Sequence, residues 1–223
     1  MVPALGLLTS FFLGALTAAD LDLDQVLDRL SKSTSRLRSF EAKISIRNWT
    51  DLLDEFDQGE KGRLILLRKD GKTFIRRQID KPQTSILVVN KGQAIFYQPL
   101  IKQAVFYNSG GRKDGAANLF LAFTSGRQKL EKDYQPRLLG REMVGASHAY
   151  VLELTPRAEE ARNQFSRVIF YLDPDLWLPV RQDIIQPNRD YQRIEFSDYQ
   201  INPDVPMSTF KIDLPKDVKK KTL

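Results

Sequence analysis

Residues 84–107 constrain the fold most, because they predict three short strands that are apolar on both faces. The stretch reads TSILVVNKGQAIFYQPLIKQAVFY, with a turn after each of the first two strands. Ile86 and Val88 point to one face, while Leu87 and Val89 point to the other. An antiparallel sheet with one wet face alternates apolar and polar residues instead. This sheet must therefore be covered twice, either by packed helices or by curling around an apolar cargo.

The first nineteen residues predict a secretory signal peptide. Met1–Ala19 contains no charged side chain, and it ends in the small residues Thr17-Ala18-Ala19 before Asp20. A small-x-small ending after an apolar run indicates cleavage after Ala19, so we expect an exported protein whose remaining residues, 20–223, form a single domain. A retained membrane anchor is the alternative, but the apolar run is shorter than the ~20 residues that cross a bilayer.

Composition excludes several kinds of catalytic site. The chain has no cysteine, which rules out thiol chemistry, cysteine-based metal sites and a lipid-modified cysteine. Its one histidine, His148, is not accompanied by a Gly-x-Ser-x-Gly elbow and reads as a structural residue. The paired carboxylates Glu159 and Glu160 have no partner that spacing identifies. We therefore expect no enzyme activity, no catalytic residues, no cofactor and no metal site.

The positive charge of the chain does not indicate nucleic-acid binding. Net charge is +6 and the isoelectric point is about 9.4. Lysine and arginine are scattered through the predicted strands, and the one dense run, Lys216–Lys221, reads as a solvated tail. In an exported protein, a positive surface favours anionic lipid headgroups or an acidic protein partner.

The rest of the chain predicts a helix followed by an antiparallel meander. Apolar residues recur at helical spacing over Asp20–Phe40, and from Glu41 the period changes to two. Asp51–Gly59 reads as an acidic loop. Short connections such as Asp70-Gly71 favour hairpins. Strands are expected over about 41–49, 62–68, 73–79, 85–90, 94–98, 103–107, 137–143, 149–155, 165–172, 178–186, 191–199 and 209–213.

One further helix is apolar almost all round and must be buried. It covers Ala116–Thr124, and its natural place is across the open face of the sheet. A helical turn is expected over Gln128–Tyr134, and a loop or a single helical turn over Pro156–Asn163. The predicted fold class is therefore α+β and mainly β: a strongly curved antiparallel sheet of about eleven or twelve strands, an unclosed β-barrel, lidded by two or three helices.

This order of elements resembles the LolA family, the periplasmic carriers of outer-membrane lipoproteins. The resemblance runs from the first helix to the ending Phe210–Val218. Its most specific part is Pro82–Ala104, with a proline, the letters SILV, a glycine turn, an aromatic strand ending FY-x-P, and then QA. Asn202 before an F-x-Φ-x-x-P ending fits as well.

The resemblance implies an apolar interior under a movable lid. A carrier of this kind receives an acylated lipoprotein from an inner-membrane ABC transporter and passes it to an outer-membrane acceptor, and we expect it to act as a monomer. Two alternatives stay open: a regulatory protein that senses lipids or lipoproteins on the same fold, and a carrier of another amphiphile such as a glycolipid.

The resemblance also implies a lid latch, an arginine on an early strand. The matching position is Arg68, although the family has proline after this arginine and this chain has Lys69. An ordinary surface arginine is the alternative. Because each acyl methylene removed from water contributes ~0.8 kcal/mol, a lipid carrier needs a sizeable apolar lining. Our candidates for lining and lid, for which ordinary core packing is the alternative, are Ile44, Leu66, Phe96, Phe106, Leu119, Phe120 and Phe123.

Overall fold

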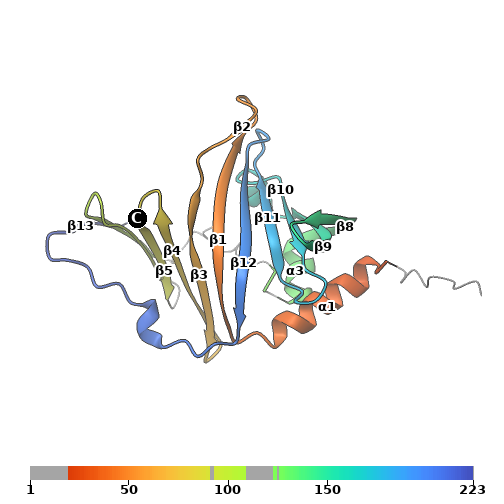
Figure 1. Ribbon diagram of the computed structural model, residues 1–223, viewed down its shortest axis with the longest axis horizontal. Helices are drawn as coiled ribbons and strands as arrows, with labels where there is room; N and C mark the ends of the chain where they lie inside the picture. Colours follow the sequence, from red (N-terminus) through yellow and green to blue (C-terminus); the bar gives the residue numbers. More distant parts are fainter. Residues whose placement is uncertain (1–19, 91–92, 109–122, 125, 223) are drawn as a thin grey trace, which may run out of the picture.

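Strands predicted from the period-two pattern join into one open, curved sheet (Figure 1). The computed structural model describes residues 20–90, 93–108, 123–124 and 126–222. In this part of the chain the strands are β1 (Ser39–Thr50), β2 (Glu55–Phe56), β3 (Glu60–Lys69), β4 (Lys72–Lys81), β5 (Ser85–Asn90), β6 (Gln93–Gln98), β7 (Gln103–Asn108), β8 (Tyr134–Val144), β9 (Ser147–Pro156), β10 (Arg167–Leu172), β11 (Pro179–Ile185), β12 (Tyr191–Ile201) and β13 (Lys219–Thr222).

The sheet is built from two meanders that meet at β1. The strand order is β13-β7-β6-β5-β4-β3-β1-β12-β11-β10-β9-β8, with β2 paired to β1. All these pairs are antiparallel except that of β13 with β7. The predicted mainly β, unclosed sheet with helices is therefore confirmed. Its described strands number thirteen, because β2 forms inside the predicted acidic loop and β13 inside the predicted C-terminal tail.

Three α-helices and one 3₁₀ helix accompany the sheet in the described part of the chain. They are α1 (Leu23–Ser35), α3 (Arg127–Asp133), α4 (Glu159–Arg162) and η1 (Met207–Phe210). Figure 1 shows α1 and α3 at the end of the sheet formed by β8–β11. None of the described helices is long and apolar enough to span a membrane. Residues 116–122 of the predicted apolar helix lie outside the described residues.

Helix α1 is shorter than the predicted helix over Asp20–Phe40. It begins at a capping box, in which the Asp22 carboxylate accepts the Gln25 N–H at 2.8 Å and the Gln25 side chain accepts the Asp22 N–H. It ends at Ser35, where side-chain hydroxyls turn back to carbonyls of the preceding turn, as Thr34 does to Leu30 at 2.9 Å. Such hydroxyls compete with the helical ladder. Phe40 consequently belongs to β1, opposite Leu66 of β3.

The C-terminal segment covers the outer face of β3–β7, and the strand predicted over residues 209–213 is wrong. Residues 207–210 form η1, which buries Phe210 against Phe74 with ring centroids 5.7 Å apart. Arg76 donates hydrogen bonds to the carbonyls of Thr209 and Lys211, at 3.1 and 3.3 Å. The Arg76 side chain already satisfies these backbone carbonyls, and the Phe210 ring is already buried. This segment therefore does not need to pair with a strand.

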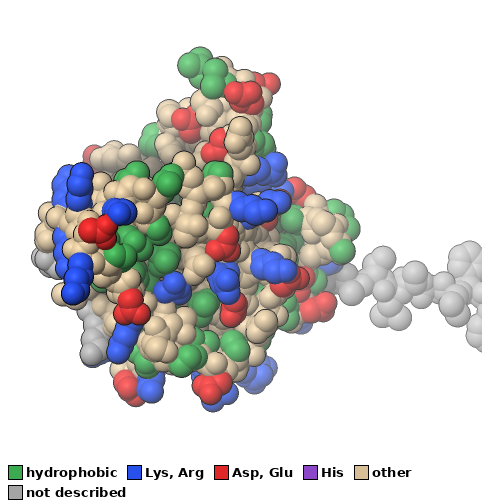
Figure 2. All heavy atoms as spheres, turned by 60° about the vertical axis from the view of Figure 1, so that its left-hand side comes forward, with side chains coloured by type: hydrophobic (Ala, Val, Ile, Leu, Met, Phe, Trp, Pro, Cys, Tyr) green, Lys and Arg blue, Asp and Glu red, His purple; other side chains and the backbone are tan. Residues whose placement is uncertain are grey.

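The packing of the C-terminal segment explains why residues 84–107 are apolar on the outer face as well as on the inner face. Val218 packs with Tyr97 and Ala104, and Phe210 packs near Val88. The outer positions of β5–β7 are thus covered by the chain's own C-terminal segment. Figure 2 shows this side of the molecule, where charged side chains of both signs are interspersed with hydrophobic ones.

Candidate functional site: the inner face of the sheet and its helical cover

The inner face of the sheet, defined here as the face that packs against α1, carries the main apolar core. Strand register places Ile44 of β1 opposite Phe196 of β12, and Leu64 of β3 opposite Ala42 of β1. Residues directly opposite each other in antiparallel strands share a face. The buried inner-face residues are Phe40, Ala42, Ile44, Ile46, Leu64, Leu66, Ile75, Ile79, Tyr150, Leu152, Leu154, Val168, Phe170, Leu172, Ile194 and Phe196.

Helix α1, Phe123 and α3 form a cover on this face. The cover buries Val26, Leu27 and Leu30 from α1 and Leu130 from α3. The ring of Phe123 meets that of Phe170 edge to face, with centroids 5.8 Å apart. The crevice between α1, Phe123 and α3 has no room for a water molecule. In the described part of the chain, the cover therefore fills the space next to β9 and β10 with its own side chains.

Arg68 of β3 fastens the cover through backbone carbonyls. Its guanidinium donates to the carbonyl of Thr34 at 2.7 Å, to that of Leu37 at 3.4 Å, and to that of Thr124. The first two carbonyls lie at the C-terminal end of α1, where the helix dipole favours a cation. Burial lowers the pKa of the Arg68 guanidinium from its ordinary value. One side chain thus connects the strand, the end of α1 and the segment that precedes α3.

Arg127 joins α3 to α1 on the solvent side of the cover. Its guanidinium binds the Asp28 carboxylate at 2.6 Å, the Glu131 carboxylate at 2.9 Å and the carboxylate of Asp24. The hydrogen bonds that Arg127 donates to the carboxylates of Asp28, Asp24 and Glu131 raise its pKa. Exposed ion pairs contribute little each, and salt screens them. This cluster is therefore a weak, ionic fastening beside the buried one made by Arg68.

A polar side chain without a partner lies inside the apolar core. Gln182 of β11 is 0% exposed and sits opposite Phe170 and Ile194 on the inner face. Neither the oxygen nor the nitrogen of its amide makes a hydrogen bond to any described residue. A buried amide without partners costs free energy that an apolar side chain of similar size would not. Gln182 is thus an unfavourable residue for this packing of the core.

Gln182→Leu is expected to stabilise the protein by about 1–3 kcal/mol, because it removes the buried unpaired amide while keeping most of the volume. The measurement is the urea midpoint of unfolding at an unchanged m-value. Gln192→Leu is the matched control, since the Gln192 amide donates to Asn48 at 3.0 Å and its loss should not stabilise. A Gln182→Leu variant less stable than the parent protein would contradict the unpaired state.

The structure brings three of the predicted lining residues together and separates others. Ile44, Leu66 and Phe123 are all buried in the inner-face core. Phe96 lies on the inner face of β6, opposite Leu87, and is half-buried. Phe106 packs on the outer face, with Tyr97, Ala104 and Val218, because register places it opposite Ile95. Leu119 and Phe120 lie outside the described residues.

Sequence reasoning missed Arg127 and Gln182 as members of this site. The spacing of Arg127 and Glu131 is that of an i,i+4 helical pair, but nothing in it points to the aspartates of α1. A signal for Gln182 was available, since it is a polar residue in the alternate series between the apolar residues Val180 and Ile184 of the predicted strand. No group of three metal-ligating side chains occurs among the residues that the structure describes.

Comparisons with known proteins support the architecture. An uncharacterized conserved protein from Thermus thermophilus shares 14% identity over 90% of this chain and 98% of its own, with a TM-score of 0.54. MucB, in the Pseudomonas aeruginosa MucA/MucB complex, shares 18% identity over 85% of this chain and 60% of its own, with a TM-score of 0.50. This chain thus spans less than two thirds of the MucB chain. Identities this low indicate a shared fold.

Three further findings complete the comparison. A LolA superfamily protein from Nitrosomonas europaea matches at 15% identity over 83% of this chain and 97% of its own, with a TM-score of 0.38. No curated protein matches the chain significantly. A family model described as an uncharacterized "-like" protein matches residues 83–221, which is well over half of the chain. The chain therefore belongs to this family, and its open, curved sheet is covered by helices on its inner face.

Proposed function

We propose that this protein is a periplasmic carrier that holds the acyl chains of lipoproteins against the inner face of its sheet. It binds and hands over its cargo without covalent chemistry. The observation that carries the proposal is the cover itself: apolar side chains of α1, Phe123 and α3 lie on an apolar sheet and are fastened by Arg68 to backbone carbonyls. A cover of this kind can leave and return.

The exchange of cover for cargo is physically balanced. Acyl chains bury their methylenes with a favourable free energy of ~0.8 kcal/mol each, and the same sheet face gains the same kind of contact from the cover. A ligand shifts such an equilibrium only by its differential affinity for the two states. When the carrier's own side chains already fill the inner face of the sheet, cargo binds with moderate net affinity. The carrier can then release the cargo to an acceptor.

The inner face of β5–β7 supports the same proposal. Leu87 and Phe96 lie opposite each other there, are only half-buried, and belong to none of the core clusters of the described residues. Figure 1 shows α1 and α3 at the other end of the sheet, beside β8–β11. In this proposal the half near β5–β7 meets the cargo first, and the cover then moves away from β9 and β10.

Gln182 fits a passenger with carbonyl groups. Ester and amide carbonyls join the acyl chains of a lipoprotein to its glyceryl and amino groups, and an amide N–H is a suitable donor for them. A cargo carbonyl beside Phe170 would give the buried Gln182 amide the partner that it lacks among the described residues. The unfavourable free energy of the buried, unpaired Gln182 amide would then be removed when cargo binds.

Export and the exchange partners complete the proposal. Residues 1–19 act as a signal peptide, an inner-membrane ABC transporter delivers the lipoprotein, an outer-membrane acceptor receives it, and the carrier is a monomer. The N-terminal sequence of protein isolated from the periplasm tests the first part, with Asp20 as the expected first residue. An N-terminus at Met1 in the membrane fraction would instead mean that the segment is retained as an anchor.

Phe96→Glu is expected to weaken the binding of a fluorescent fatty-acid probe by about tenfold or more, because it buries a carboxylate against the acyl chain. Ile95→Glu is the matched control, since Ile95 is also half-buried and lies on the outer face of the same strand. Probe titration of both variants, with circular dichroism as a check of folding, makes the measurement. Equal losses in the two variants would remove the inner face of β6 from the binding site.

A second candidate function is a regulatory binding module on the same fold. The observation that favours it is the match to MucB, which was solved in complex with its partner protein MucA. Mass spectrometry of material that co-purifies from the periplasm separates the two functions. Acylated lipoproteins or free lipids extracted from the protein support the carrier, whereas one stoichiometric protein partner without lipid supports the regulatory module.

A further inference from the structure

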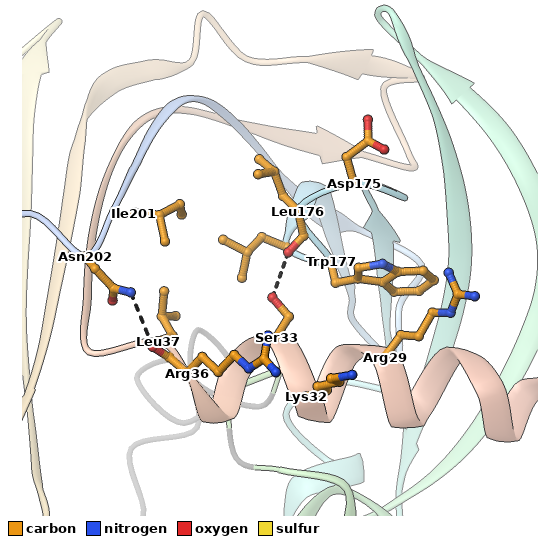
Figure 3. Close-up of a pocket in the computed structure, with 11 residues that line it drawn as sticks. Arg29, Lys32, Ser33, Arg36, Leu37, Asp175, Leu176, Trp177, Ile201 and Asn202 are labelled. Atoms are coloured by element: carbon orange, nitrogen blue, oxygen red, sulfur yellow. Dashed lines mark hydrogen bonds between the residues drawn. The ribbon is translucent and has the colours of Figure 1, made fainter.

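A pocket of about 550 Å³ lies at the rim of the molecule, outside the closed interior (Figure 3). One wall is the solvent side of α1, and the others are the loop between β10 and β11 and the end of β12. Its volume falls in the range of roughly 300–1,000 Å³ that is typical of small-molecule sites. Solvent reaches this pocket without any movement of α1, because Leu176 and Ile201 in its lining are 41% and 43% exposed.

The loop wall of the pocket is rigidly built. The Asp173 carboxylate accepts the N–H groups of Asp175 and Leu176, both at 2.9 Å, and the Ser147 hydroxyl at 2.8 Å. Burial opposes ionisation of Asp173, but these hydrogen bonds hold its pKa below the ordinary value. The Ser33 hydroxyl of α1 donates to the Leu176 carbonyl at 2.7 Å, which ties the loop to the helix (Figure 3).

Trp177 forms the apolar wall of the pocket. Its indole stacks on Tyr150 with centroids 5.4 Å apart and rings inclined by 22°. The backbone φ of Trp177, 55°, is unusual for a bulky residue, and its backbone N–H donates to the Asp173 carbonyl at 2.9 Å. The backbone hydrogen bond therefore holds the main chain of Trp177 in this conformation at some conformational cost, while the stack on Tyr150 holds the indole. Leu37 and Leu178 add buried apolar surface beside it.

Three cations without acidic partners surround this apolar lining. Arg29, Lys32 and Arg36 lie at positions i, i+3 and i+7 of one side of α1 and its C-cap (Figure 3). None of the three forms a salt bridge with any residue that the structure describes. Arg29 lies over the Trp177 ring at 5.6 Å from its centroid. The lining contains a single carboxylate, that of Asp175.

We propose that this pocket binds a single-chain amphiphile with an anionic head group, such as a fatty acid. The acyl chain lies against Trp177, Leu176 and Ile201, and the carboxylate or phosphate faces Lys32 and Arg36. The pocket adjoins the inner-face core through Trp177 but opens to solvent along the exposed side of α1, so binding there leaves the helical cover closed. It therefore goes beyond the proposed carrier function and gives the protein a second, surface-accessible site for a lipid-derived anion.

Quenching of Trp177 fluorescence by a brominated stearate tests this site. The chain has two tryptophans, so a Trp49→Phe background leaves Trp177 as the only tryptophan. We expect saturable quenching by the brominated acid below its micelle concentration, and about tenfold weaker binding of its uncharged methyl ester. Equal affinity for acid and ester, or no quenching by the monomeric acid, would overturn the proposal.

Charge reversal in the same background makes the test specific. The double variant Lys32→Glu with Arg36→Glu is expected to raise the apparent Kd for the acid about tenfold or more. Lys61→Glu is the matched control, because Lys61 is an exposed lysine of β3 on the outer face of the sheet, and it should change nothing. An affinity for the acid that survives the double reversal would mean that the cations of α1 do not hold the head group.

Two further arms separate this site from the alternatives. Phe96→Glu, which tests the inner face, should leave the quenching of Trp177 unchanged; a joint loss would assign the quenching to the interior and overturn the separate site. Vesicles of phosphatidylglycerol test a membrane surface as the source of the anion. Co-sedimentation with these vesicles that is abolished by the double reversal, without quenching by the monomeric acid, would make this rim a membrane contact and overturn the pocket.

Discussion

Phe123→Ala is expected to destabilise the empty protein by about 3–5 kcal/mol and at the same time to strengthen its binding of acyl chains. Phe123 is 1% exposed in the inner-face core, and its ring contacts that of Phe170. Truncation removes part of the cover's own contact with the sheet and leaves a space shaped for hydrocarbon. If the cover competes with cargo for this face, palmitate should recover a larger share of stability in the variant than in the parent protein.

Phe74→Ala is the matched control for this prediction. Phe74 is 3% exposed, and its ring lies 5.7 Å from that of Phe210, but on the outer face of the sheet. Its truncation should cost a similar free energy of unfolding without any gain in acyl binding. Thermal unfolding with and without palmitate, read with a fluorescent fatty-acid probe, measures both effects. Identical responses of the two variants to palmitate would mean that Phe123 does not compete with cargo.

Arg68→Leu is expected to lower the free energy of unfolding by about 3 kcal/mol, because charge-assisted hydrogen bonds are lost and buried carbonyls are left without their donor. The carbonyls concerned are those of Thr34, Leu37 and Thr124. In the proposed cycle this residue latches the closed cover, so its loss should slow the release of cargo more than it changes loading. Stopped-flow measurement of probe uptake and of transfer to acceptor vesicles separates the two steps.

Two further variants serve as controls for Arg68→Leu: one keeps the positive charge at position 68, and the other changes an arginine elsewhere on the same strand. Arg68→Lys keeps a cation but not the planar fork, and it should recover only part of the lost stability. Arg63→Leu alters the same strand on the outer face, where Arg63 makes only a 3.8 Å contact with the Glu41 carboxylate, and it should change neither rate. Equal effects of Arg68→Leu on uptake and transfer would count against a latch.

Local patterns of the sequence were enough to predict the class of this fold. Ser85–Asn90 was predicted with its observed bounds, and most other strands within a few residues, because period-two alternation and turn residues are local properties. The prediction failed where long-range packing decided the conformation. Residues 207–210 became η1 because Phe210 is buried against Phe74, and residues 219–222 became β13 because they meet the edge of β7.

Within the candidate site, the sequence identified apolar side chains but not the faces they occupy. Phe96 and Phe106 looked equivalent, yet they lie on opposite faces because Phe96 is opposite Leu87 and Phe106 is opposite Ile95. Which face counts as inner depends on where α1 and the C-terminal segment pack. That choice is made by contacts between elements more than a hundred residues apart in the chain, such as Phe74 with Phe210.

Alternation, turn chemistry and composition are local properties, and together they specify an open antiparallel sheet with more apolar surface than one layer can hide. The elements that cover this apolar surface, α1 and α3 on one face and the C-terminal segment on the other, are set by long-range packing. The partners of Arg68 are main-chain carbonyls, which every residue type possesses, so no residue pattern could have named Thr34, Leu37 and Thr124. The unpaired state of Gln182 and the bare cations around the rim pocket are likewise properties of packing, because a side chain lacks a partner only when its neighbours in space are known.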